Sequence, residues 1–176
     1  MKMLLVLLIF LNFSLSFGNC FVEAGFYYKV NPYILFAIAK VESNLNPYAI
    51  EVISNKKLPI NCSKRRKNGK YYYSCFPKSK DEALKILKLA QKEGANYSLG
   101  LGQINKIWIE RYKLNAEKLF DACYNVYWSA YILNRCYKFF GNSWKTIDCY
   151  NKGLLASSES EYVLKIYKEL SSLWKE

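Results

Sequence analysis

The chain has 176 residues, with 26 Lys and Arg against 14 Asp and Glu, and therefore a formal net charge of +12. It contains no histidine, which excludes Ser-His and Cys-His nucleophile pairs and any metal site that uses histidine. The cysteines lack CxxC spacing, so we expect no metal and no other cofactor, and an enzyme would depend on carboxyl or tyrosine chemistry. The positive charge suits an anionic partner such as a cell-wall polymer or a membrane surface, or it only aids solubility; no nucleic-acid-binding signature is present.

Residues 1–18 have the pattern of a secretory signal peptide. The chain begins "MKMLLVLLIFLNFSLSFGNC", with one Lys, an apolar run and then small residues, and cleavage is expected after Gly18. An uncleaved anchor is the alternative, but the apolar run from Leu4 to Leu11 is too short to span a bilayer comfortably. We therefore expect an exported protein that is not integral to the membrane after cleavage.

An apolar helix is predicted between the Asn-Pro dipeptides at 31–32 and 46–47, and Glu42 stands near its end. The residues that precede Glu42 on the same helical face are apolar, namely Leu35, Ile38 and Ala39. Two interpretations follow from this pattern. Glu42 is either a solvated residue at the rim of the stripe, or a half-buried carboxyl whose raised pKa lets it donate a proton.

The segment "KNGK" predicts a tight β-hairpin, because Asn68-Gly69 is the strongest short hairpin signal. Counting outward from the opposed pair Lys67 and Lys70 places Cys62 opposite Cys75. By alternation this pair falls on a non-hydrogen-bonded rung, where Cα atoms lie about 4.5 Å apart, within reach of a disulfide. We therefore predict a Cys62–Cys75 bridge.

Two further disulfides are expected among the other four cysteines. Cys136 and Cys149 flank a predicted helix–helix turn at residues 141–143, and they are placed to join its two arms. Cys20 and Cys123 then remain, and a bridge between them would tie the mature N-terminus to the core.

Two helices are predicted directly after the hairpin. Ser79 and Glu82 form a capping box for the first, which stops at Gly94. Its buried face is expected to consist of Ala83, Leu87 and Ala90. A glycine-rich turn in "SLGLGQIN" leads into the second helix, whose inward side chains are expected to be Ile104, Ile107 and Trp108.

The last third of the chain predicts three more helices. A long apolar helix occupies "FDACYNVYWSAYILNRCYKFFG", and a short one is capped by Ser143 and ends near Gly153. The last begins with a capping box of Ser158 and Glu161, and its stripe is Val163, Ile166, Tyr167 and Leu170. The predicted fold is mainly α (α+β), a single disulfide-stapled domain over residues 19–176 with a small β-hairpin.

Three short motifs, in order, resemble the soluble-type lytic transglycosylases, whose fold is similar to goose-type lysozyme. They are "AIAKVESNLNPYAI", where Glu-Ser ends a helix, the turn "YSLGLGQIN", and "CYNKG" at the floor of the family's cleft. The resemblance covers roughly residues 20–153 and is closest to the transglycosylases of type IV secretion and conjugation machines, although type III and pilus relatives share much of it. Ser129 stands where the family usually has Gly, and Gly102 where many relatives have Met.

The resemblance implies cleavage of the bond between N-acetylmuramic acid and N-acetylglucosamine in peptidoglycan, with Glu42 as the general acid and then the base. The substrate's own 6-hydroxyl would replace water and leave a 1,6-anhydromuramoyl end. No second carboxyl lies in the three motifs; Glu51 and Asp81 are the nearest candidates, and surface solvation explains both.

The resemblance also assigns roles around Glu42. Ser43 would position Glu42 or the sugar, although helix capping explains it equally well. Ser98 and Gly100 would line the cleft, Gln103 would bind an acetamido or backbone group, and Asn105 would cap and shape the loop. Tyr150 would donate a hydrogen bond near the reacting centre, with core packing as its alternative, and Asn151 would be more structural than catalytic. Tyr71, Tyr72 and Tyr73 would either stack on sugars or pack the hairpin.

The expected partners are peptidoglycan glycan strands, with secretion-system components as further candidates, and the expected protein is a periplasmic monomer. Two alternatives stay open. One is a wall-binding assembly factor with little turnover, and the other is a hydrolytic, lysozyme-like protein that would need a second, water-activating carboxylate.

Overall fold

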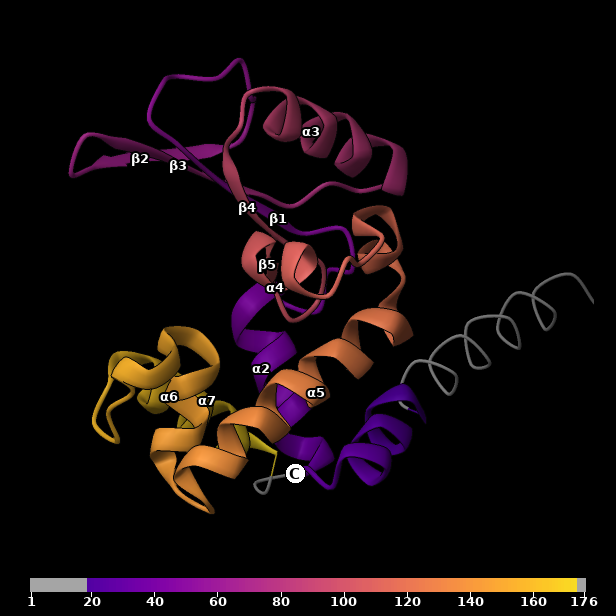
Figure 1. Cartoon of the computed structure of the whole chain (residues 1–176), viewed down its shortest axis with the longest axis vertical. Helices are drawn as coiled ribbons and strands as arrows, with labels where there is room; N and C mark the ends of the chain where they lie inside the picture. Colours follow the sequence, from indigo (N-terminus) through magenta and orange to yellow (C-terminus); the bar gives the residue numbers. More distant parts are fainter. Residues whose placement is uncertain (1–18, 174–176) are drawn as a thin grey trace, which may run out of the picture. The chain divides into compact units, whose positions relative to one another are not determined.

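The computed structural model describes residues 19–173, so the predicted signal peptide lies outside the described residues. The chain forms two compact units, one containing Ala39–Asn125 and the other the described residues up to Ile38 together with those from Val126 onward. The predicted fold class is confirmed, because helices dominate and the strands form one small antiparallel sheet (Figure 1), as in a lysozyme-like α+β domain.

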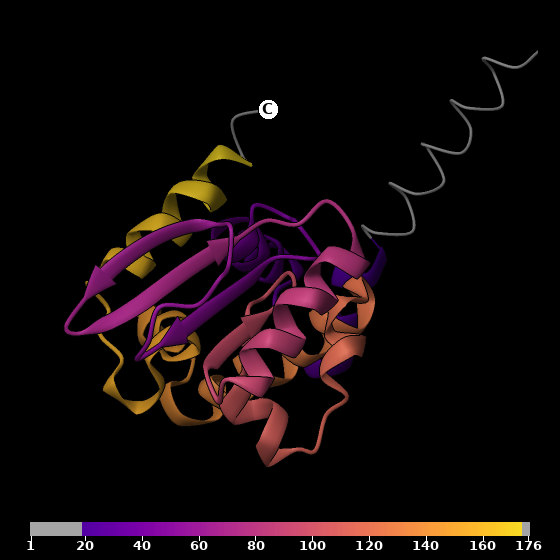
Figure 2. The ribbon, with the colours of Figure 1, turned by 90° about the horizontal axis from the view of Figure 1, so that it is seen from above.

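The sheet lies in the Ala39–Asn125 unit and is larger than the predicted hairpin. Its five strands run in the order β2-β3-β1-β4-β5, and each neighbouring pair is antiparallel (Figures 1 and 2). The strands are β1 (Ile50–Ser54), β2 (Ser63–Lys67), β3 (Lys70–Cys75), β4 (Asn96–Leu99) and β5 (Ile104–Asn105). The predicted hairpin is therefore one edge of a sheet whose centre is β1.

The predicted hairpin register is confirmed at every rung. Lys67 lies opposite Lys70, and Ser63 lies opposite Ser74. The Cys62–Cys75 disulfide follows directly, with its Cα atoms 5.1 Å apart. Asn68 and Gly69 both have positive φ, at 49° and 76°, as a two-residue hairpin turn of this kind requires.

The two faces of the sheet differ in chemistry. One face is apolar and buried, and its central side chains are Ile50, Val52, Tyr73, Tyr97, Leu99 and Ile104. Helix α3 (Lys80–Lys92) packs on this face, and Gln91 donates a hydrogen bond to the Tyr97 hydroxyl at 3.4 Å. The other face carries polar side chains and is partly open to solvent.

Helix α3 forms as the sequence predicts. Ser79 is its N-cap and accepts a hydrogen bond from the Glu82 backbone N–H. The predicted inward residues are buried, namely Ala83, Leu87 and Ala90. Gly94 follows the helix with φ at 63°, which is the left-handed conformation expected of a C-terminal stop.

Helix α4 (Lys106–Arg111) starts later than predicted, and this changes which side chains are buried. Ile104 is buried as expected, but it belongs to β5. The prediction that Ile107 points inward is wrong, since its side chain is 59% exposed and Ile109 is buried instead. Because Ile104 and Asn105 form a strand, the helix starts only at Lys106, and a different side of it, with Ile109, faces inward. A 3-10 helix, η1 (Ala116–Phe120), follows α4 in the same unit.

The other unit contains a helical segment at residues 19–28, followed by the start of α2 (Pro32–Ser43), where Asn31 Oδ1 accepts from the Tyr33 N–H at 2.9 Å. The remaining helices are α5 (Ala122–Phe140), α6 (Trp144–Lys152), η2 (Gly153–Leu155) and α7 (Glu161–Ser172). The predicted Cys136–Cys149 disulfide is confirmed, with Cα atoms 5.7 Å apart. Cys20 and Cys123 are disulfide-bonded as well, and no cysteine in the described part of the chain is free.

Helix α7 corrects two predictions. Its N-cap is Ser160, which accepts from the Val163 N–H at 3.1 Å, and not Ser158. Tyr167 is 55% exposed, whereas Tyr162 is buried. The physical reason is a tertiary contact, because the Ser160 hydroxyl donates to the fully buried carboxylate of Asp148 in α6, and this selects Ser160 as the cap.

Within residues 19–173, no helix combines the length and apolar character that a membrane crossing requires. Over the same residues, no cluster of His, Cys, Asp or Glu side chains has the composition of a metal site.

Candidate active site

Glu42 is the second-last residue of α2, where the helix gives way to a sharp turn. The side chains that precede it on its face are buried, with Leu35 at 1%, Ile38 at 0% and Ala39 at 2% exposure, and Glu42 itself is partly buried. Of the two interpretations of Glu42, the partly buried carboxyl fits the structure better than the fully solvated one.

The turn after Glu42 is built from two residues in the left-handed region. Asn44 has φ at 51° and Leu45 at 61°, and the Leu45 N–H donates to the Ala39 carbonyl at 3.3 Å. A leucine rarely adopts this conformation, so the surrounding structure must hold it there. The turn directs the chain toward β1 immediately after the helix ends.

Ser43 supports the helix end and does not face solvent. Its side chain is fully buried, and its hydroxyl donates to the Ala39 carbonyl at 2.8 Å. Of the expected alternatives for Ser43, a structural role at the helix end matches this geometry. Direct contact with a sugar does not, because the hydroxyl is inaccessible.

The glycine-rich loop after β4 is tied to the residue that precedes β1. The Gly100 N–H donates to the Ala49 carbonyl at 2.8 Å, and Gln103 Nε2 donates to the same carbonyl at 3.1 Å and to the Gly100 carbonyl at 2.9 Å. Gln103 has φ at 48°, which folds its side chain back over the loop. Its amide nitrogen is thus used internally, whereas its amide oxygen accepts no hydrogen bond from the described residues.

Asn125, which the sequence analysis missed, holds the same loop from the other side. Its side chain is fully buried; Oδ1 accepts from the Gly102 N–H, and Nδ2 donates to the carbonyls of Leu99 and Leu119, each at 2.8 Å. A Cβ on Gly100 would lie 2.2 Å from this Nδ2, so only glycine fits there. The available signal was one amide within an otherwise apolar stretch, "ACYNVYW".

A row of polar side chains crosses the open face of the sheet. Four residues on neighbouring strands lie directly opposite one another and so share that face, namely Ser74, Glu51, Ser98 and Asn105. Asn105 Nδ2 donates to the Ser98 hydroxyl at 3.1 Å, while its Oδ1 accepts from the Ile107 N–H and caps α4. The predicted residues Ser98 and Asn105 are therefore brought together, with Asn105 shaping the loop as expected.

Glu51 is a second carboxyl on this polar face. Its side chain is 33% exposed, and Arg65 Nη2 approaches its Oε1 at 3.9 Å. Burial raises the pKa of Glu51, and the positive charge of Arg65 lowers it by less. Asp81 differs, because it is exposed in the first turn of α3, the helix that packs on the opposite face, so solvation explains it.

The remaining predicted residues have their own surroundings. Tyr150, in α6, donates a hydrogen bond to the Ser129 hydroxyl at 3.1 Å, and Asn151 beside it is exposed. Tyr73 is fully buried with its hydroxyl bound to the Leu58 backbone, so its expected sugar-stacking alternative is wrong. Tyr72 lies on the polar face and is partly exposed.

The Transglycosylase SLT domain family matches residues 19–165, a span that contains Glu42, the glycine-rich loop and Tyr150. The chain belongs to the SLT transglycosylase family. Relatives include the Type IV secretion system protein virB1 of Brucella abortus, Brucella melitensis and Brucella suis, each 32% identical over 109 residues. The matched region is 62% of this chain and 39% of each relative, so this SLT chain spans well under half of their length.

Within the SLT domain, the Ala39–Asn125 unit supplies Glu42, the loop from Gly100 to Gln103, and the polar row. Ala49 connects these parts of the site, because candidate residues lie before and after it in the sequence and its carbonyl accepts two hydrogen bonds from the loop. Glu42 lies on the helical side of Ala49 and Glu51 on the strand side. This unit therefore contains an acidic group near a helix end and a row of hydrogen-bonding groups that includes a second acid, Glu51.

Proposed function

We propose that this SLT domain is a peptidoglycan lytic transglycosylase in which Glu42 is the catalytic residue. One observation carries the proposal: in a chain of the SLT family, a partly buried carboxyl is the second-last residue of α2, and the later loop motif is anchored at Ala49, between that helix and the polar sheet. A general acid needs such a site, because partial removal of water favours the protonated form of a carboxyl near neutral pH.

The reaction uses one carboxyl twice. Glu42 donates its proton to the bridging oxygen as the bond from C1 of N-acetylmuramic acid to that oxygen breaks, and the acetamido oxygen of the same sugar bonds to C1. The Glu42 carboxylate then takes the proton of the 6-hydroxyl while this oxygen bonds to C1 and the acetamido oxygen leaves. No water is consumed, Glu42 is protonated again, and the product ends in 1,6-anhydromuramic acid.

The loop and the polar row would bind the sugar that carries this chemistry. The Gln103 amide oxygen is oriented by the two hydrogen bonds of its nitrogen, and it is suited to accept the N–H of an acetamido group. Asn105 is partly exposed and would contact sugar hydroxyls, whereas the buried Ser98 would support it through their hydrogen bond. To donate a hydrogen bond to substrate, the role that the family resemblance assigns to it, the Tyr150 hydroxyl would have to turn away from Ser129.

The relatives suggest where such an enzyme would act. Because regions of this chain match virB1 proteins of type IV secretion systems, we propose that it opens the cell wall locally for the assembly of such a machine, in the periplasm after export. A non-catalytic wall-binding factor is the alternative. The presence of Glu42, Gln103 and Tyr150 together argues against it, since a binding protein has no need for a partly buried acid.

The first test replaces Glu42 with Gln, which keeps the shape and removes the proton. We expect E42Q to fold and to release soluble products from purified sacculi at least about a hundredfold more slowly, the usual scale for loss of general acid catalysis. Glu110→Gln is a matched control, because Glu110 is exposed on α4 and its ion pair within residues 19–173 is with Lys106. Near wild-type cleavage by E42Q would disprove the assignment.

Glu51 favours a second outcome, hydrolysis, because it places another carboxyl on the polar face where a water could be activated. Mass spectrometry of digested sacculi separates the two reactions. Transglycosylation gives muropeptides lighter by one water that resist borohydride, whereas hydrolysis gives reducible ends. We expect anhydro ends to dominate in both the wild type and Glu51→Gln; reducible ends that disappear in E51Q would identify a lysozyme.

A further inference from the structure

The edge of the sheet carries a concentration of positive charge that the proposed chemistry does not use. Five of the seven residues from 64 to 70 are basic, namely Lys64, Arg65, Arg66, Lys67 and Lys70, and all five are exposed. The edge position of β2 leaves one side of this hairpin unpaired. Only Arg65 has a carboxylate near it, Glu51 at 3.9 Å; the other four have no acidic partner within the described residues.

The register divides these cations between the two faces. Arg65, Lys67 and Lys70 share the polar face with Glu51 and Ser98, whereas Lys64 and Arg66 lie on the opposite face. Lys67 and Lys70 are direct cross-strand neighbours. Like charges in this arrangement repel and weaken the strand pairing. A bound anion would relieve this repulsion and so stabilise the hairpin.

Aromatic rings hold the two guanidinium groups in place. Arg65 lies over the ring of Tyr72 at 5.1 Å, and Arg66 over that of Tyr71 at 5.3 Å. A guanidinium stacked on a ring loses part of its freedom but keeps its N–H edges available for a carboxylate. On the polar face, this arrangement presents Arg65 already oriented beside the two lysines.

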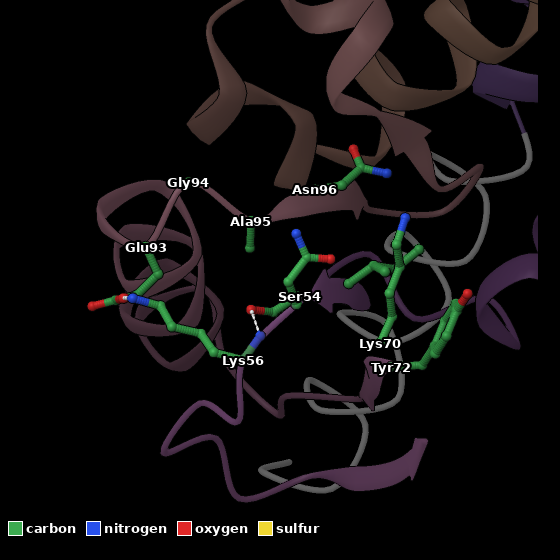
Figure 3. A pocket seen from close by; sticks show the side chains of 10 residues that line it. Ser54, Lys56, Lys70, Tyr72, Glu93, Gly94, Ala95 and Asn96 are labelled. Carbon is green, nitrogen blue, oxygen red and sulfur yellow. Dashed lines mark hydrogen bonds and ion pairs between the residues drawn. The ribbon is translucent and has the colours of Figure 1, made fainter. Parts of the chain in front are cut away.

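A pocket of about 540 Å³ adjoins the hairpin on the same face (Figure 3). Ile53 and Asn96 line it, and each lies two residues from the polar row, at Glu51 and Ser98, so the pocket continues that face along the strands. From β3, Lys70 and Tyr72 contribute. In Figure 3, Lys70 and Asn96 extend their polar ends to the same side, while a Lys56–Glu93 ion pair of 2.5 Å forms another wall.

We propose that this basic hairpin face, defined by Arg65, Lys67, Lys70, Tyr72 and the adjoining pocket, binds the carboxylates of the peptide side chains on the peptidoglycan strand. The proposal rests on the proposed function and names what part of the wall is recognised. The face continues the polar row that would hold the glycan, and the peptides carry most of the negative charge of such a strand. Amide and ring groups of the pocket suit a peptide next to its carboxylate.

A membrane surface is the other anionic partner that the charge could suit, and the residue pattern disfavours it. Segments that bind lipid surfaces combine cations with inserted apolar side chains. The hairpin tip is Asn68-Gly69, and the cations on the polar face lie next to Ser63, Tyr72 and Glu51; the apolar Ile53 pairs with Tyr72 within the sheet and not at the tip. The basic hairpin face therefore suits a polar anion, such as a peptide carboxylate, better than a lipid surface.

The test compares two variants that lose the same charge from opposite faces. Lys67→Gln/Lys70→Gln removes two cations from the polar face, and Lys64→Gln/Arg66→Gln removes two from the other face. Both are made in the full mature chain with E42Q, so that strands bind without being cut. Binding is measured to peptide-bearing glycan strands and to strands from which an amidase has removed the peptides, at low and high salt.

We expect K67Q/K70Q to weaken binding to peptide-bearing strands about three- to tenfold at low salt, with no change for peptide-free strands and little effect of K64Q/R66Q. High salt should remove the difference. The thermal midpoint of K67Q/K70Q should not fall, because the variant relieves a repulsion.

Three results would overturn the proposal. They are equal binding of E42Q to both kinds of strand, equal losses in the two charge variants, and binding of anionic phospholipid vesicles that depends on Lys67 and Lys70 while peptides make no difference. Failure of the proposed function would look different, because the protein with Glu42 intact would then release no anhydro ends from any strand, whatever the binding data show.

Discussion

Asn125 gives the glycine-rich loop its shape through three hydrogen bonds from one side chain. Backbone groups of a tight loop cannot all pair with one another, and a buried group without a partner is strongly unfavourable. The amide supplies one acceptor and two donors, which is the set that Gly102, Leu99 and Leu119 need. Gly100 is required for the same reason, since any Cβ would enter the space of Asn125 and of the Leu119 carbonyl.

Replacing Asn125 with Ala should therefore lower the free energy of unfolding by about 2–4 kcal/mol, because two carbonyls and one N–H lose their partner in a dry site. Urea denaturation followed by circular dichroism measures this change. Asn142→Ala is the control, since Asn142 is exposed in the turn before α6 and should tolerate the change. A loss below about 0.5 kcal/mol for N125A would show that water or a relaxed loop replaces the amide.

At the scale of elements, the sequence predicts what is local. The hairpin register and the Cys62–Cys75 bridge follow from Asn68-Gly69, because a two-residue turn determines every rung beyond it. The same holds for α3, where the capping box and the apolar stripe lie within one segment. Most of the elements were therefore accessible from spacing and capping alone.

The missed elements depend on contacts between distant residues. β4 has four residues and pairs with β1, which is far away in the sequence, and the two-residue β5 then pairs with β4. The polar row was hidden for this reason, since Glu51, Ser98 and Asn105 become neighbours only after the strands pair. Likewise Ser160 caps α7 because Asp148 binds it, and no local pattern contains that information.

The hairpin bridge should stabilise the Ala39–Asn125 unit. Cys62 and Cys75 are 13 residues apart, and closing a loop of this size in the unfolded chain is worth about 3 kcal/mol. We expect Cys62→Ser/Cys75→Ser to lower the free energy of unfolding by an amount of this order. The hairpin should also unfold locally more often, so that trypsin cleaves its backbone at the basic residues.

Cys136→Ser/Cys149→Ser provides the comparison, because that bridge spans the same 13 residues in the other unit. It should produce a loss of similar size while the hairpin stays resistant to trypsin in the folded state. Equal early cleavage of the hairpin in both variants would mean that the two bridges stabilise one cooperative structure and that neither acts locally.

At the scale of the whole molecule, Glu51 in one unit and Asp148 in the other are carboxyls whose ionisation affects stability, and the two effects have opposite signs. Burial raises the pKa of Glu51, against the weaker effect of Arg65. Burial would also raise the pKa of Asp148, but hydrogen bonds from Ser160, the Ser157 N–H and Lys152 outweigh it and hold the pKa below its ordinary value. Ionised Glu51 thus destabilises the fold, and ionised Asp148 stabilises it.

The pH windows follow from these directions. Glu51 has an ordinary pKa of 4.5, and the folded chain binds its proton more tightly than the unfolded chain. Stability is therefore lost as pH rises from 4.5 through the folded pKa, and it stays lower above. Asp148 has an ordinary value of 3.8 and a lower folded value, so its contribution is present above 3.8 and is lost as pH falls through the folded pKa.

Thermal midpoints of Glu51→Gln and Asp148→Asn, measured against the wild type from pH 3 to 8, should separate these windows. E51Q should melt above the wild type near pH 7, with the difference shrinking as pH falls toward 4.5, because the wild-type carboxyl then becomes protonated and neutral like the amide. D148N should melt below the wild type near pH 7, with a difference that narrows only below pH 3.8. A difference between E51Q and the wild type that does not change with pH would show that Glu51 titrates alike in the folded and unfolded chains, and that burial and Arg65 cancel.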